Sequence, residues 1–254
     1  MTNTKPVNTS RLKLFLYMWI AGMLGVVVIT VMVVPQLVAD IALPMPLWVM
    51  LLVSSVQSAL FVALAVWLGV VLAPRVGLRA TVFEAAVTSG SISKALRPQL
   101  FPGLVAGFLG GIGLYAIGGY ASPAELANAA QQFTVPILAR VLYGGITEEL
   151  LLRWGLMTVL LWLSWRFLQR GKGAPKLMYI WLAIIVSALL FGAGHLPAAT
   201  MQVGELTAYI VLFVVGANAI FGLLFGYLYW RHGLEAAMIA HFTAHVVSYA
   251  LGAT

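Results

Sequence analysis

Seven long apolar runs constrain the fold of this chain more than any other feature of its sequence. They cover residues 14–38, 47–73, 99–118, 135–165, 177–195, 207–230 and 234–253. A helix that spans a bilayer needs about 20 mostly apolar residues. Here 62% of the 254 residues are hydrophobic and 8% are charged, whereas about a quarter of an ordinary soluble domain is charged. The sequence therefore predicts an all-α, polytopic transmembrane helical bundle with about seven spans.

The basic residues between these runs predict the orientation of the bundle. Lys and Arg occur before the first run, between the second and third, between the fourth and fifth, and between the sixth and seventh. The loops 39–46, 119–134 and 196–206 contain neither residue. Because Lys and Arg concentrate in cytoplasmic loops, this pattern predicts a cytoplasmic N-terminus. The first run is longer than the apolar region of about 7–15 residues in a cleavable signal peptide, so we expect it to remain as a membrane helix.

Charge and cysteine content exclude several classes of function. The formal net charge is +7. Because the bases flank apolar runs, they indicate membrane topology, with lipid as the partner, rather than nucleic-acid binding. The chain has no cysteine, which excludes disulfides, thiolate metal sites and a cysteine nucleophile.

Glycines recur at four-residue spacing within two of the runs. Gly103, Gly107 and Gly111 lie in the third run, and Gly222 and Gly226 lie in the sixth. Small residues at this spacing let helix backbones approach closely in lipid. We therefore expect these glycines to be sites of helix packing.

A few ionisable side chains interrupt the fourth, fifth and seventh runs. Among them are Arg140, Glu148, Glu149, Arg153, His195, His241 and His245. Burying such a group in a membrane helix costs about 2.5–3.5 kcal/mol on insertion scales, so it is a functional-site hypothesis by default. A single ion pair or a single histidine is commonly structural, and we interpret Arg140 in that way. Two acids and three histidines on three separate runs favour a shared site.

Helical spacing distinguishes the two acids. Glu149 and Arg153 are four residues apart and share a helix face, so we expect an ion pair that supports the site. Glu148 is turned about 100° away, and the residue four positions after it is Leu152. Glu148 therefore has no such partner and is the carboxylate available as a general base.

The histidines allow more than one interpretation. His241 and His245 are also four residues apart, so both imidazoles face the same way and are able to donate hydrogen bonds to an oxyanion or to bind a metal. His195 lies just before Pro197, at the expected end of a helix where water can enter.

We divide the chain accordingly into N-terminal membrane helices at 1–134, with a cytoplasmic polar segment at 75–98 that holds a surface helix, and a helical core at 135–254.

Three short motifs resemble those of the CPBP family, which contains CAAX proteases and bacteriocin-processing or bacteriocin-immunity proteins. EELLLR at 148–153 is similar to the family motif EExxxR, FGAGH at 191–195 to FxxxH, and HFTAH at 241–245 to HxxxN. The resemblance covers about residues 135–250, and it is fairly specific because three motifs occur in order on three separate runs.

The resemblance implies an intramembrane endopeptidase of the glutamic type with a CPBP-like catalytic core. Glu148 would deprotonate the attacking water with help from His195. The oxyanion would be stabilised by His241 and His245. No cofactor is favoured, and the substrate would be a lipidated, leader-bearing or otherwise membrane-associated peptide or protein that enters from the bilayer or the cytoplasmic side. The location implied is a bacterial plasma (inner) membrane.

One departure from the family pattern leaves alternatives open. The last motif position is usually Asn, and here it is His245. An imidazole still donates one hydrogen bond. The substitution also makes Glu148, His195, His241 and His245 a credible set of zinc ligands, so a zinc-dependent protease is an alternative. A proton-coupled transporter is another, because membrane carboxylates and histidines also form proton relays, and a non-enzymatic immunity or scaffold protein is a third.

The depths of the motifs in the membrane impose one further constraint. At 1.5 Å per residue, His241 should lie about 10 Å from the cytoplasmic end of its helix, and His195 about 26 Å from the cytoplasmic end of its own. The two side chains can meet only if the fifth helix is short or strongly tilted. We therefore predict that this helix is short and that non-helical chain after His195 lines a cavity.

Overall fold

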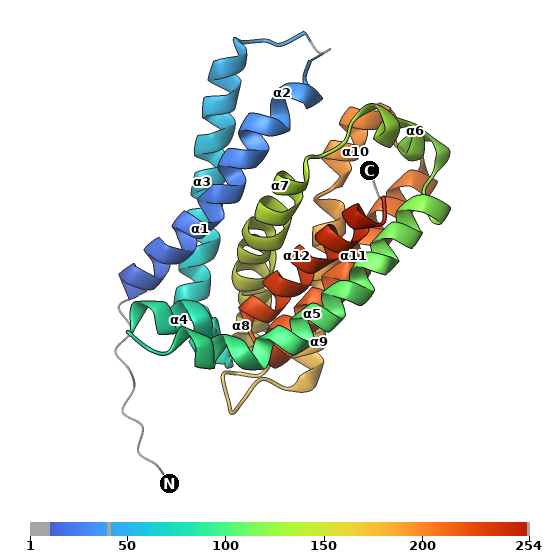
Figure 1. Cartoon of the computed structure of the whole chain (residues 1–254). Helices are drawn as coiled ribbons and strands as arrows, with labels where there is room; N and C mark the ends of the chain where they lie inside the picture. The colour runs from blue at the N-terminus through green and yellow to red at the C-terminus, as the bar shows by residue number, and fades with distance from the viewer. Residues whose placement is uncertain (1–10, 40–41, 253–254) are drawn as a thin grey trace.

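The computed structural model describes residues 11–39 and 42–252, which form helices and no β-strand (Figure 1). The long helices are α1 (Arg11–Met32), α3 (Leu47–Leu72), α5 (Ile92–Ala116), α9 (Leu177–Ala193), α11 (Ala208–His232) and α12 (Leu234–Ala250). The short ones are α2 (Val34–Leu37), η1 (Ala73–Val76), α4 (Thr81–Val87), η2 (Ile117–Ala121), α6 (Ala124–Gln132) and α10 (Leu196–Val203). A further helix carries the first motif in consecutive segments: α7 (Ile137–Ala139), η3 (Arg140–Glu148), η4 (Leu150–Met157), α8 (Thr158–Leu163) and η5 (Ser164–Leu168). The expected all-α bundle is confirmed.

Five helical stretches in the described residues are long and apolar enough to cross a membrane. They are Arg11–Leu37, Leu47–Val76, Ile92–Ala121, Leu177–Val203 and Ala208–His232. The protein is therefore an integral membrane protein. The other two apolar runs form the motif helix and α12, and α12 has only 17 residues. The total of about seven spans and the cytoplasmic N-terminus stay predictions.

Helices α5 and α12 pack along the first group of glycines. A Cβ at Gly107 would lie 2.6 Å from the carbonyl oxygen of Ala240, and a Cβ at Gly111 would lie 2.5 Å from Cβ of Val247. Gly103 faces the same helix one turn earlier. No larger side chain fits in these places without moving α12, so the expected packing role of this group is confirmed.

Helices α9 and α11 pack along the second group. A Cβ at Gly222 would lie 2.8 Å from Cβ of Ala188, and a Cβ at Gly226 would lie 3.1 Å from a methyl group of Ile184. The expected packing role is confirmed here as well. The contact fixes the helix that ends before His195 against the centre of the bundle.

The N-terminal helices hold the motif helix from its other side. The backbone of α1 passes so close at Gly25 that a Cβ there would overlap the hydroxyl of Thr147, and that hydroxyl donates to the carbonyl oxygen of Gly22 at 2.7 Å. From α3, the carbonyl oxygen of Val66 accepts a hydrogen bond of 3.1 Å from the indole of Trp154. Two buried polar bonds therefore fix the motif helix against α1 and α3. The division of the chain after residue 134 stays a prediction.

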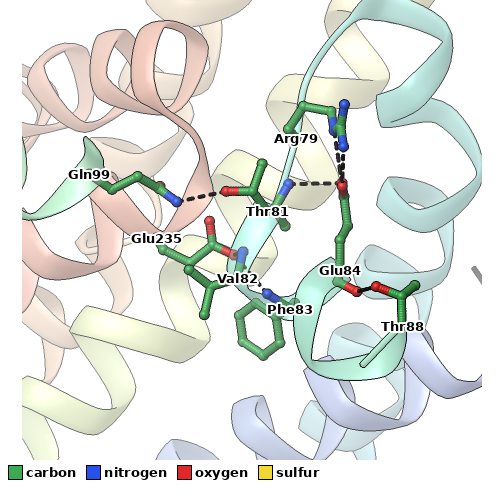
Figure 2. Close-up of polar contacts among 9 residues, drawn as sticks. Arg79, Thr81, Val82, Phe83, Glu84, Thr88, Gln99 and Glu235 are labelled. Carbon is green, nitrogen blue, oxygen red and sulfur yellow. Dashed lines mark hydrogen bonds and ion pairs between the residues drawn. The ribbon is translucent and has the colours of Figure 1, made fainter. Parts of the chain in front are cut away.

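The polar segment at 75–98 contains the expected short helix, α4, and buried polar side chains attach it to the bundle (Figure 2). Glu235, at the start of α12, accepts hydrogen bonds from the backbone N–H groups of Val82 and Phe83 at 2.8 and 3.0 Å. Gln99 of α5 donates to the hydroxyl of Thr81 at 2.9 Å. The carboxylate thus satisfies N–H groups at the first turn of α4 that have no partner within their own helix.

The two ends of the bundle differ in composition. Figure 1 shows α4, the connection from α8 to α9 and the turn from α11 to α12 at one end, and α2, α6 and α10 at the other. The first end, which we call the basic end, holds the Lys and Arg residues of the connecting segments: Arg11, Lys13, Arg75, Arg79, Lys94, Arg97, Arg166, Arg170, Lys172, Lys176 and Arg231.

Candidate active site

The first motif lies on a helix with an unusual backbone. Segments η3 and η4 are π-helical, and Glu149 stands between them with α-helical angles of φ −65° and ψ −36°. We expected regular α-helical spacing, so the wide turns are a difference from the sequence-based expectation. Short π-helical insertions are frequent at functional sites.

Glu149 and Arg153 form a fully enclosed ion pair. Nη1 of Arg153 lies 3.1 Å from Oε1 of Glu149, and the two side chains are 1% and 0% exposed. The guanidinium lies between two aromatic rings, 4.8 Å from the centroid of Phe191 and 5.3 Å from that of Phe225. Its Nη2 donates to the carbonyl oxygen of Gly222 at 3.3 Å. The pairing expected from the four-residue spacing is therefore present, and it connects the motif helix to α9 and α11.

The same carboxylate also binds His241. Nδ1 of His241 lies 2.8 Å from Oε1 of Glu149, and the imidazole stacks on Phe225 at a centroid distance of 4.5 Å. A carboxylate paired with Arg153 accepts hydrogen bonds, so Nδ1 carries a proton. The other ring nitrogen, Nε2, then points toward Glu148, whose Oε2 lies 3.9 Å away. Glu149 thus sets the tautomer and the orientation of this histidine.

Glu148 differs from its neighbour in having no hydrogen bond from any described residue. Its side chain is 16% exposed and lines a cavity. The two adjacent acids therefore occupy different environments, one enclosed and paired, the other open to a cavity. This difference is the one that their helical positions led us to expect.

His245 lies one turn beyond His241 on α12, and the two imidazoles stack at a centroid distance of 4.9 Å. Nδ1 of His245 is buried without a hydrogen-bond partner. Both rings lie against Gly144: a Cβ there would be 2.9 Å from Nε2 of His245 and 3.2 Å from Nε2 of His241. The glycine just before the first motif therefore makes room for the two histidines of the third.

His195 occupies the short turn between α9 and α10. Its Nδ1 lies 2.9 Å from the carbonyl oxygen of Phe191, and because a carbonyl only accepts, Nδ1 carries the proton and Nε2 has the free lone pair of a neutral ring. The helix before it, α9, has 17 residues and forms with α10 one apolar stretch, Leu177–Val203, that is long enough to cross a membrane, so the short fifth helix stays a prediction. The expectation of non-helical chain after His195 is wrong, because α10 begins at the next residue with Pro197 in its first turn, where proline is tolerated.

The four predicted catalytic side chains line one cavity. Glu148, His195, His241 and His245 all contribute to it, and its volume is about 710 Å³. They come from the motif helix, the turn after α9, and α12, which are far apart in the sequence. The remaining walls are mostly apolar side chains of α1, α2, α5, α9 and α11.

Three polar residues in this cavity were not recognised as site residues from the sequence. Arg140, which we interpreted as structural, and Tyr143 and Asn218 all line it. Nε of Arg140 donates to the carbonyl oxygen of Val135 at 2.8 Å, and Asn218 donates to the carbonyl oxygen of Val214 in its own helix. A polar side chain inside an apolar run was the available signal for Arg140 and Asn218.

The zinc alternative was tested against this geometry. Within residues 11–39 and 42–252, no group of three or more His, Cys, Asp and Glu side chains is arranged to hold a metal ion. The four residues named as zinc ligands thus share a cavity without forming a ligand cluster, and we assign no step to a metal.

Comparison with known proteins identifies one family. Residues 130–247 match the family described as type II CAAX prenyl endopeptidase Rce1-like. No curated protein and no solved structure matches the chain. The matched residues contain all three motifs, and with them Glu148, His195, His241 and His245. This agrees with the resemblance seen in the sequence. Through these residues, which make up less than half of the chain, the protein is similar to the Rce1-like type II CAAX prenyl endopeptidases, a family of membrane proteases.

Proposed function

We propose that this protein is an intramembrane endopeptidase that hydrolyses a peptide bond of a lipidated, leader-bearing or otherwise membrane-anchored substrate, with Glu148 as the general base. The observation that supports this most directly is the convergence of Glu148, His195, His241 and His245 on one cavity. Hydrolysis inside a bilayer requires an enclosed polar site with room for water and for the substrate carbonyl, and this cavity has the necessary volume.

The chemical step follows from the two groups with free acceptors. Glu148 removes a proton from water, and Nε2 of His195 accepts a hydrogen bond from the same water. The water oxygen attacks the carbonyl carbon, and the carbonyl oxygen becomes an oxyanion. When the C–N bond breaks, the proton on Glu148 passes to the leaving nitrogen. The products are a carboxylic acid and an amine, and Glu148 is regenerated.

The oxyanion is stabilised by the two histidines of α12. Nδ1 of His245 is buried and has no hydrogen-bond partner, so the neutral ring carries its hydrogen on Nε2. The Nε2–H group is then able to donate a hydrogen bond into the cavity. His241 already uses its Nδ1–H for Glu149, so its Nε2 donates only when the ring holds two protons. The carboxylate of Glu149 stabilises that imidazolium, in the way that the aspartate of a Ser-His-Asp triad supports its histidine.

The mechanism proposed here uses no metal. Metal analysis of the purified protein tests this directly. Stoichiometric zinc, together with activity that a chelator removes and added zinc restores, would show that the zinc-dependent version is correct. Activity that persists in metal-free protein is the expected result.

The role of Glu148 is tested by Glu148→Gln, which keeps the shape of the side chain and removes the base. Loss of a general base lowers the rate by about 10²–10⁴-fold. We would compare new peptide N-termini in membrane fractions of cells that express the wild type, Glu148→Gln, or the matched control Glu125→Gln, an exposed acid on α6. Cleavage products should appear with the wild type and the control and be absent with Glu148→Gln. Equal products from all three would exclude the protease function assigned to this cavity.

A further inference from the structure

Arg140 is a cation of the cavity that the proposed mechanism does not use. It is the first residue of η3, and its side chain lines the cavity. Among the Lys and Arg residues that the structure describes, only Arg140 and the enclosed Arg153 lie away from the basic end. A charge inside a bundle of membrane helices is costly, and its presence there points to a functional role.

The guanidinium of Arg140 is held in place, but most of its donors are unused. Its Nε donates to the carbonyl oxygen of Val135 at 2.8 Å, which fixes the side chain at the wall of the cavity. Its two terminal nitrogens make no hydrogen bond or ion pair with any described residue, and they are not enclosed by the protein. Since an arginine carries five N–H donors, four remain available to a bound molecule.

No described acid compensates the charge of Arg140 at close range. Glu148 is the only acidic residue among those that line the cavity, and it lies eight positions further along the motif helix. Arg153, in contrast, has a carboxylate oxygen at 3.1 Å. The planar fork of a guanidinium binds the two oxygens of a carboxylate in parallel. The arginine in the cavity therefore lacks the partner that the enclosed arginine already has.

We propose that Arg140 forms a subsite that binds a carboxylate of the substrate peptide. The proposal rests on the proposed protease function, in which the scissile carbonyl lies beside Glu148. The carboxylate is either the C-terminal α-carboxylate of the peptide or the side chain of an Asp or Glu within it, because both present the same pair of oxygens to the guanidinium. Arg140 then selects and positions the peptide, and Glu148 remains the general base.

The spacing along the motif helix indicates where this carboxylate lies in the peptide. The helix lines the cavity with a stripe that starts at Arg140, passes Gly144 and Glu148 and ends at Leu152. Eight residues of helix correspond to about 12 Å, and the guanidinium is folded back toward Val135, which lengthens the separation from Glu148. Because an extended peptide advances by about 3.3 Å per residue, the carboxylate belongs to a residue roughly three to five positions from the scissile bond.

Peptide binding tests the subsite without turnover. The probes are three peptides of Leu and Ala that carry an uncharged fluorophore: one with a free C-terminal carboxylate, one with a C-terminal amide, and one amide with a single internal Glu. Each is titrated with Glu148→Gln protein in detergent micelles, and fluorescence anisotropy measures the affinity. The titrations are repeated with Arg140→Gln added, and with Arg166→Gln added as the matched control, because Arg166 is an exposed arginine of the same helix outside the cavity.

At least one of the two acidic peptides should bind about 10–100-fold more tightly than the neutral amide, because hydrogen bonds between charged groups are strong. Arg140→Gln should bring the acidic peptides to the affinity of the neutral amide, and Arg166→Gln should not. Arg140→Lys keeps the charge but loses the fork, so it should retain only part of the preference. Tighter binding of the free C-terminus identifies the α-carboxylate as the ligand, and tighter binding of the internal Glu identifies a side chain. Equal affinity for all three peptides, or a preference that survives Arg140→Gln, would overturn the inference.

Cleavage of the same peptides separates this inference from the proposed function. In protein with Glu148 intact, Arg140→Gln should raise the KM of the preferred acidic peptide about 10–100-fold. If cleavage depends on Glu148 but falls equally for acidic and neutral peptides in Arg140→Gln, Arg140 acts on Glu148 and the subsite alone is refuted. Carboxylate binding that depends on Arg140, without any cleavage that depends on Glu148, would refute the protease function alone.

Discussion

Replacing Glu149 by Gln should destabilise the protein by about 3 kcal/mol. The change removes the charge that faces Arg153, whose side chain is 1% exposed and whose Nη1 lies 3.1 Å from Oε1 of Glu149. Breaking a buried pair by removing one partner typically costs about 3–5 kcal/mol, because the other charge stays buried without compensation. The rings of Phe191 and Phe225 still contact the guanidinium and retain part of its stabilisation. We therefore expect the lower end of this range.

The double variant Glu149→Gln/Arg153→Met gives the decisive comparison. A methionine fits between the same two rings, and because the double variant removes both charges, no buried charge is left without compensation. Stability should return to within about 1 kcal/mol of the wild type, so the double variant should be about 2–3 kcal/mol more stable than Glu149→Gln alone. Proteolytic activity should not return, since Nδ1 of His241 has lost the carboxylate that orients it.

Unfolding in detergent micelles, followed by tryptophan fluorescence, measures these free energies. The matched control is Arg79→Met, because Arg79 pairs with Glu84 at the surface and its side chain is 60% exposed. Loss of an exposed pair should cost less than about 1 kcal/mol. The reasoning is refuted if Glu149→Gln costs no more than this control, or if the double variant is as unstable as Glu149→Gln alone.

Three further substitutions test the site and its support. Gly144→Ala should lower activity about 100-fold without unfolding the protein, because the added methyl group displaces both imidazoles of α12. The control is Gly216→Ala, because that glycine has open space around it. Equal activities of the two variants would contradict this prediction. His245→Asn keeps a hydrogen-bond donor and should stay within about tenfold of the wild type, whereas His245→Leu should lose about 10²–10³-fold; equal loss in both would argue against oxyanion stabilisation. Glu235→Ala leaves two N–H groups of α4 unpaired and should lower the free energy of unfolding by about 2 kcal/mol. Glu235→Gln keeps an acceptor oxygen and should restore most of this loss. A Gln variant as unstable as the Ala variant would exclude this capping role.

Local spacing predicted one ion pair and two helix contacts correctly. The four-residue interval between Glu149 and Arg153 predicted their ion pair, and the position one residue earlier left Glu148 facing elsewhere. The glycine spacing predicted where α5 meets α12 and where α9 meets α11. These predictions succeed because each depends only on the periodicity of a single helix, which the sequence contains in full.

Other features depend on contacts between helices and were not predicted. The role of Gly144 appears only when α12 lies against the motif helix, since its spacing within its own segment gives no sign of the two imidazoles. Arg140 was interpreted as structural, yet its side chain lines the cavity, because the adjoining helices do not cover it there. The π-helical turns of η3 and η4 also had no signal in the apolar pattern.

The sequence by itself determined that this protein is a helical membrane protein, that several of its few ionisable residues lie inside apolar runs, and which acid is paired within its own helix. Lipid permits few charges, so their positions are informative without coordinates. Only the tertiary structure decided that Glu149 holds a histidine 92 residues away in the chain and that Glu148, His195, His241 and His245 line one cavity. Both depend on how each helix is rotated and where it crosses its neighbours, and close packing between helices fixes these quantities.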